Sequence, residues 1–111
     1  MDKKTEKKLQ QMQMMEQQIQ HLASQKQQLQ AQITEISSAV EEVEKKEYAY
    51  KLLGGIMVKK KSSDIKESLK KKEKEINIQT KKIEEQEEKI HSKAKKLQQE
   101  VLKKMKGDEN E

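Results

Sequence analysis

The sequence contains no cysteine, proline, arginine, phenylalanine or tryptophan among its 111 residues. Without cysteine the chain has no disulfide framework, no thiol nucleophile and no thiolate metal ligand. It also has no apolar run near the roughly 20 residues that a membrane span needs, and its N-terminal segment lacks the apolar block of a secretory signal. These absences predict a soluble, cytoplasmic protein that does not associate with a membrane.

The composition is too polar for a compact globular core. Charged residues make up 41% of the chain and hydrophobic residues 31%, and two tyrosines are its aromatic residues. Small domains bury only a limited share of their surface even when they are apolar. High charge with low hydrophobicity also fits disorder, but disordered chains usually contain proline and lack sustained periodicity. The strong helical periodicity described next therefore predicts extended helices.

Apolar residues recur in the N-terminal half with alternating steps of three and four. The two heptad positions are Met12, Ile19, Lys26, Ile33 and Val40, and Met15, Leu22, Leu29, Ile36 and Val43. A spacing of 3.5 residues keeps one narrow stripe facing a partner helix. The pattern predicts a long helix over about 4-47 that packs along another helix.

A second, weaker heptad pattern follows in the C-terminal half. One heptad position is apolar throughout: Leu69, Ile76, Ile83, Ile90 and Leu97. The other becomes apolar only toward the C-terminus: Glu73, Thr80, Glu87, Ala94 and Val101. Gly107 and the acidic residues after it are typical of a helix end. We expect one domain over 1-111, with a second helix over 62-106 and an acidic tail over 107-111.

An antiparallel register follows if the second helix folds back along the first. Paired positions then sum to about 109, so that Ile19 faces Ile90. Lys26 is the polar exception in the first stripe. Its aliphatic stem can lie along Ile83 while its ammonium reaches Glu87, an arrangement that sets register more than it stabilises.

The segment 48-61 between the helices is predicted to form a β-hairpin. It holds strand-type apolar residues around a glycine pair, which tolerates the positive φ angles of tight turns. Its members are Tyr50, Leu52, Leu53, Gly54, Gly55, Ile56, Met57 and Val58. An isolated hairpin is marginal in water, and the helix stripes already cover each other. We therefore expect hairpins of other subunits to bury these side chains.

This arrangement resembles the β-type subunits of prefoldin, a class that includes archaeal prefoldin beta and eukaryotic prefoldin subunit 6. The resemblance rests on Tyr50-Lys51-Leu52-Leu53-Gly54 and Ile56-Met57-Val58-Lys59, placed between two heptad stretches of similar length. It covers nearly the whole chain. It implies a mainly α fold, in which two antiparallel helices of a coiled coil are joined by one hairpin that assembles into a β-barrel platform.

The resemblance further implies a chaperone without enzymatic activity. Two α-type and four β-type subunits would form a heterohexamer that holds unfolded client proteins at the coiled-coil tips and delivers them to a group II chaperonin. The residues near both chain ends are the candidate client-binding tips: Leu9, Met12, Met14, Met15, Val101, Leu102 and Met105. Flexible methionine suits a surface that binds clients of many different sequences. Met12 and Met15 can equally be positions of the heptad stripe that only pack against the other helix.

A structural or tethering coiled coil with a basic, nucleic-acid-contacting surface is the alternative. Lysines cluster at Lys59-Lys60-Lys61 and Lys70-Lys71-Lys72. The chain has no arginine, which commonly binds phosphates, and its basic clusters have no interleaved aromatic residues that could stack on bases. Solvated helix and strand faces are therefore the favoured interpretation of these lysines.

No catalytic, cofactor or metal site is predicted. His21 and His91 are the only histidines and fall off the heptad stripes, without other ligands of a metal site. Gly54-Gly55 lacks the flanking pattern of a phosphate-binding loop. We expect no cofactor and no enzymatic activity.

Overall fold

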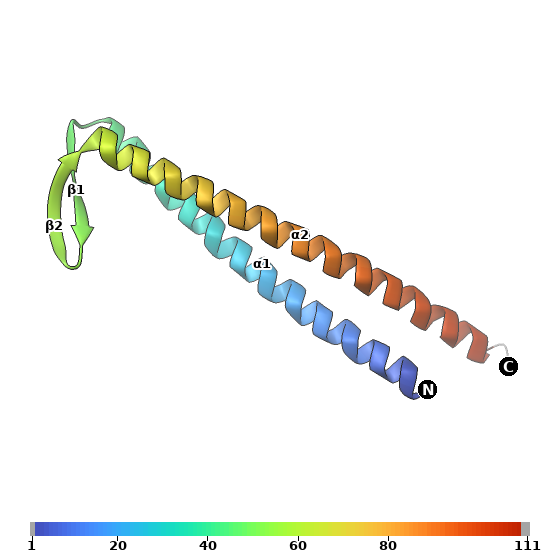
Figure 1. The fold of residues 1–111 in the computed structure, drawn as a ribbon. Coiled ribbons are helices and arrows are strands. Elements are labelled where there is room, and N and C mark those ends of the chain that lie inside the picture. The colour runs from blue at the N-terminus through green and yellow to red at the C-terminus, as the bar shows by residue number, and fades with distance from the viewer. Residues whose placement is uncertain (1, 110–111) are drawn as a thin grey trace. The chain divides into compact units, whose positions relative to one another are not determined.

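The computed structural model describes residues 2–109 of the chain. Helix α1 (Lys3–Glu44) is followed by strands β1 (Tyr48–Leu53) and β2 (Ile56–Lys61) and by helix α2 (Ser62–Glu109) (Figure 1). The strands pair in antiparallel fashion and join the two helices. This confirms the predicted class, which is mainly helical with one hairpin between two long helices.

The chain divides into two compact units. The hairpin unit is Gln27–Lys81, which holds the C-terminal part of α1, both strands and the start of α2. The terminal unit contains the part of α1 up to Lys26 and the part of α2 from Lys82 onward. Each unit is described separately below.

In the hairpin unit, one narrow stripe of each helix is covered. Ile36 and Ile76 are buried, and Val43 and Leu69 are half-buried. Thr80 lies at a polar seam position, where its hydroxyl donates a hydrogen bond to the carbonyl oxygen of Ile76, 2.9 Å away. Because this bond satisfies the hydroxyl within its own helix, threonine is compatible with the stripe.

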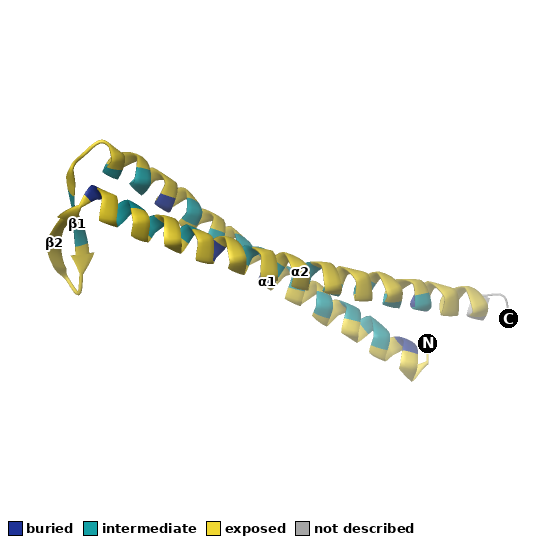
Figure 2. Ribbon diagram, turned by 45° about the horizontal axis from the view of Figure 1, so that its top comes forward, coloured by how far each residue is buried: buried dark blue, intermediate teal, exposed yellow. Residues whose placement is uncertain are grey.

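In the terminal unit, the covered stripe continues at the heptad positions. Leu22 and Val101 are buried, together with Thr5, whereas Ile19 and Ile90 are half-buried. Figure 2 shows buried and half-buried positions recurring along the helices and exposed residues on the rest of their surfaces. No large side chain of the described residues is fully buried, which accords with a chain too polar for a compact core.

Helix α1 ends three residues before the position expected from the sequence. The sequence favours a helix to residue 47, but α1 ends at Glu44. The amides of Lys45 and Lys46 donate to the carbonyl oxygens three residues earlier, and the carbonyl of Glu47 accepts a hydrogen bond from the amide of Ser62 at 2.9 Å. The helix stops because the backbone at Glu47 pairs with the start of α2.

Helix α2 continues past the glycine that was expected to stop it. The sequence favours an end at residue 106 and an acidic tail from 107, but α2 runs through Gly107 to Glu109. Gly107 does not take up the positive φ of a helix-terminating glycine. Glycine within a helix costs only about 1 kcal/mol relative to alanine, so it weakens the helix here without ending it.

Candidate functional site

The hairpin is closed by a two-residue glycine turn. Gly54 has φ of 54° and Gly55 has φ of 83°. Turns with positive φ at both central residues match the right-handed twist of the two flanking strands. The pairing starts at Leu53 with Ile56 beside the turn and ends at Tyr48 with Lys61 beside the helices.

The register assigns the side chains of the hairpin to two faces. Directly paired residues share a face, and successive residues alternate between faces. One face carries Tyr48, Tyr50, Leu52, Met57, Lys59 and Lys61, and the other carries Ala49, Lys51, Leu53, Ile56, Val58 and Lys60. Both faces therefore present apolar side chains near the turn.

The large apolar side chains of the hairpin are exposed. Leu52, Ile56 and Met57 are each about two-thirds exposed, at 69%, 67% and 68%. Tyr48, Tyr50, Leu53 and Val58 are also exposed. Burying an apolar side chain of this size stabilises by about 1.5–3 kcal/mol, and contiguous exposed apolar surface marks interaction sites. The hairpin therefore has the properties of a surface for strand pairing with another chain.

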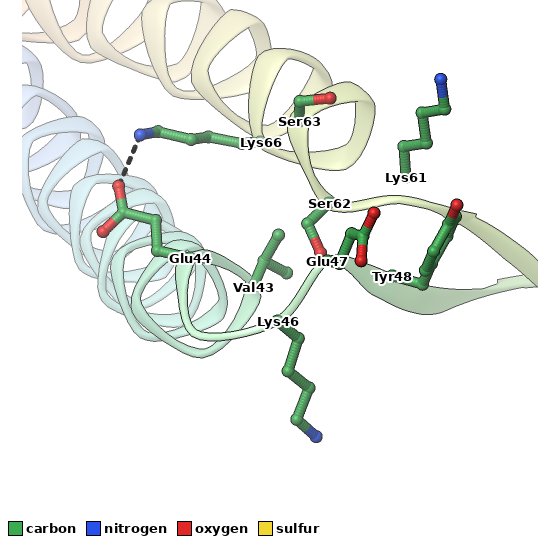
Figure 3. Close-up of a pocket in the computed structure, with 9 residues that line it drawn as sticks. All are labelled: Val43, Glu44, Lys46, Glu47, Tyr48, Lys61, Ser62, Ser63 and Lys66. Carbon is green, nitrogen blue, oxygen red and sulfur yellow. Dashed lines mark ion pairs between the residues drawn. The ribbon is translucent and has the colours of Figure 1, made fainter.

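An ion pair between α1 and α2 lies beside the base of the hairpin (Figure 3). The ammonium of Lys66 lies 2.6 Å from the carboxylate of Glu44, and this contact lowers the pKa of Glu44 below its ordinary value. The hydroxyl of Ser62 is buried and has no hydrogen-bond partner among residues 2–109. These three residues line one pocket with six others: Val43, Lys46, Glu47, Tyr48, Lys61 and Ser63.

The sequence did not single out the residues at the base of the hairpin. A signal for Glu44 and Lys66 was available, since the antiparallel register derived from the heptads brings these two positions together. The buried hydroxyl of Ser62 had no such signal, because its burial depends on the path of the hairpin and not on helical periodicity.

The terminal unit contains all the residues predicted to form client-binding tips. Met14 is 61% exposed, and Leu102 and Met105 are also exposed. Leu9, Met12 and Met15 are half-buried, whereas Val101 is buried. The predicted set is therefore divided between an exposed group and residues that belong to the covered stripe.

A polar cluster holds the start of α1 against α2. One carboxylate oxygen of Asp2 accepts a hydrogen bond from the amide of Thr5 at 2.7 Å, and the other lies 3.4 Å from the ammonium of Lys104. Lys8 lies 3.1 Å from Glu100. Hydrogen bonds from Thr5 lower the pKa of Asp2 from 3.8 to about 2, with a smaller contribution from Lys104. A carboxylate at a helix N-terminus caps its free amides.

Sequence reasoning missed this cluster, although the heptads contained a signal for it. Thr5 and Lys8 precede Met12 and Met15 by seven residues and so continue both positions of the stripe. Neither is apolar, and the pattern had been followed only as far as its first apolar positions, Met12 and Met15. Their burial and pairing extend the seam toward the N-terminus.

Two kinds of feature are absent from the described residues: a metal-holding cluster and a membrane-spanning helix. No group of three or more histidine, cysteine or acidic residues in residues 2–109 is placed to hold a metal ion. His21 and His91 are both exposed. Within the same range, neither helix has a stretch apolar and long enough to cross a bilayer.

Comparisons with known proteins agree with this geometry. The model of a family described as prefoldin subunit matches residues 6–108. The structure is similar to the crystal structure of the prefoldin beta subunit from Thermococcus strain KS-1, with a TM-score of 0.84 and 28% sequence identity, covering 90% of this chain and 90% of that one. A search of curated proteins found no match. The family match spans nearly the whole chain, and the chain belongs to the prefoldin subunit family.

Proposed function

We propose that this chain is the β-type subunit of a prefoldin heterohexamer that binds unfolded proteins without ATP and delivers them to a group II chaperonin. Membership of the prefoldin family supports the role of a chaperone subunit that assembles with other prefoldin subunits. The single observation that carries the proposal is the hairpin, whose apolar residues are exposed on both faces. A chain with this surface requires partners.

In the proposed assembly, two α-type and four β-type subunits join through their hairpins into a β-barrel platform. The exposed residues Leu52, Leu53, Ile56 and Met57 would be buried there. Their burial offsets the cost of ordering a hairpin that is marginal alone. The similarity to an archaeal prefoldin beta subunit supports the assignment to the β type.

Clients bind at the terminal unit in this proposal. Met14, Leu102 and Met105 are the residues that offer exposed apolar surface there. Unbranched, polarizable methionine side chains adapt to different apolar partners. Val101, Met12 and Met15 are covered to different degrees by the helix pair, so they would reach a client only if the two helices separated locally.

A double truncation tests whether the hairpin mediates assembly and the chain ends bind clients. Removing residues 1–15 and 98–111 deletes the predicted tips and leaves the hairpin unit, Gln27–Lys81, complete. Mixed with an α-type prefoldin subunit, the shortened chain should form a complex of the same stoichiometry by light scattering after gel filtration. It should no longer suppress aggregation of a denatured client.

The full-length chain under the same conditions is the reference for both measurements. Full suppression by the shortened chain would exclude client binding at the chain ends. Failure of the full-length chain to form any complex with the α-type subunit would exclude the proposed assembly.

A further inference from the structure

The hairpin carries charge of one sign only. Residues 48–61 contain Lys51, Lys59, Lys60 and Lys61 and no aspartate or glutamate. The three lysines of β2 are exposed. None of the ion pairs formed within residues 2–109 includes any of these four lysines. The strands therefore present positive charge that no ion pair within the described part of the chain neutralises.

The lysines lie toward the helix end of the hairpin, and the pairs without a lysine lie next to the turn. The two pairs next to the turn, Leu52–Met57 and Leu53–Ile56, are apolar. The four pairs nearer the helices, from Tyr48–Lys61 to Lys51–Val58, each contain one lysine. The ammonium of Lys59 lies 4.6 Å from the centre of the Tyr48 ring, a cation–π contact that keeps it at the basic end.

The charge of the hairpin disfavours its pairing with the hairpin of a second copy of this chain. Pairing two identical hairpins would double the positive charge without adding a single carboxylate. Like charges on neighbouring strands destabilise a sheet, and lysines on an edge strand are a common protection against pairing between identical edges. The apolar end favours association, while the basic end penalises a partner of the same charge.

We infer that the hairpin pairs with the hairpin of a different subunit, one whose strands carry acidic side chains opposite Lys59, Lys60 and Lys61. The inference rests on the proposed assembly and adds the chemistry of the partner. Opposite charges across the strands select this subunit and disfavour direct pairing with a second copy. Further copies of this chain then enter the complex through the acidic subunit.

Mixing two charge forms of the chain tests the exclusion of self-pairing. The reversed variant combines Lys59→Glu, Lys60→Glu and Lys61→Glu, and the control combines Lys70→Glu, Lys71→Glu and Lys72→Glu, three exposed lysines on α2 with the same change in charge. At about 0.05 M salt, the reversed variant mixed with the natural chain should form mixed oligomers in sedimentation velocity.

The natural chain alone, and its mixture with the control variant, should remain less associated than this mixture. About 0.5 M salt should dissociate the mixed oligomers, because it shortens the screening length. Equal association of the natural chain alone, or of the control mixture, would overturn the inference.

Titration with an α-type prefoldin subunit separates the inference from the proposed function. Reversal of Lys59, Lys60 and Lys61 should weaken the complex on the order of tenfold or more, and the control variant should bind as the natural chain does. Equal binding of the natural chain and the reversed variant would overturn the charge inference and leave the proposed assembly intact. No binding of the natural chain would overturn both.

Discussion

The ammonium of Lys26 lies 2.9 Å from the carboxylate of Glu87. Both residues belong to the terminal unit, and Lys26 is the one polar residue within the ten positions of the N-terminal heptad stripe. Glu87 raises the pKa of Lys26 chiefly by accepting its hydrogen bond. The heptad register predicted this pair, and the contact confirms it.

A charge exchange tests whether this pair sets the register. Lys26→Glu places two carboxylates together and should lower the midpoint of thermal unfolding, followed by circular dichroism at 222 nm. Adding Glu87→Lys should recover most of the loss, because the opposite charges then face each other again. If the double variant melts as low as Lys26→Glu alone, the pair does not contribute to the register.

Substitution of two nearby isoleucines should change the free energy of unfolding according to how deeply each is buried. Ile76 is 4% exposed and Ile78 is 56% exposed on the same helix. Ile76→Ala should reduce the free energy of unfolding by about 2–4 kcal/mol, whereas Ile78→Ala should change it by no more than about 0.5 kcal/mol. Urea unfolding of both variants measures the difference, and equal losses would contradict the seam described here.

The sequence predicted the helix pair because its signal is repeated many times. Ile36, Ile76 and Leu22 are buried at the expected heptad positions. A single displaced residue changes such a pattern little, since each repeat independently specifies the same face. The ends of the helices lack this redundancy. The end of α1 at Glu44 depends on the backbone contact between Glu47 and Ser62, which no local pattern specifies.

The same contrast holds for the candidate functional residues. The apolar residues of the hairpin stood out as one run in a polar chain. At the chain ends, Met14 lies off the heptad stripe and is exposed, while Val101 lies on it and is buried. The cluster of Asp2, Thr5 and Lys104 joins residues from both ends of the sequence, so only a register extended through polar positions could have indicated it.

One substitution, glycine to alanine, should have opposite effects at two sites. Gly55 has φ of 83°, and no atom lies within 4 Å of the position that a Cβ would take, so alanine there would be strained by its backbone alone. Gly55→Ala should destabilise the hairpin by about 1–2 kcal/mol. Gly107 lies within α2 without positive φ, and Gly107→Ala should stabilise the helix by up to about 1 kcal/mol.

Hydrogen exchange separates the two effects. Gly55→Ala should speed the exchange of amides in β1 and β2, and Gly107→Ala should slow the exchange of amides in the last turns of α2. Slower exchange in the hairpin of Gly55→Ala would contradict the left-handed turn.

Acid should weaken the N-terminal cap that Asp2 provides for α1, over a defined range of pH. The pKa of Asp2 is lowered from 3.8 to about 2, so its carboxylate stabilises the folded chain above pH 3.8, and this contribution is lost as the pH falls toward 2. The amide of Thr5, which donates to Asp2, should show a chemical-shift transition with a midpoint near 2. Asp2→Ala should abolish the transition, and a midpoint near 3.8 would contradict the cap.

Exposed apolar residues of the terminal unit should affect client protection without affecting stability. Met14, Leu102 and Met105 are exposed, so Met14→Gln, Leu102→Gln and Met105→Gln together remove little buried surface and retain good helix formers. The triple variant should melt near the natural chain and assemble with an α-type prefoldin subunit, but suppress client aggregation several-fold less well. Light scattering of a denatured client measures the suppression.

Ile78→Gln is the control for this experiment, because it also removes an exposed apolar side chain but lies in the hairpin unit. It should leave suppression unchanged, since the client is expected to contact the terminal unit. Equal protection by the triple variant and the natural chain would remove Met14, Leu102 and Met105 from the client surface. Protection would then have to come from residues of the heptad stripe such as Met12 and Met15, which are half-buried and become fully accessible only when the helices separate.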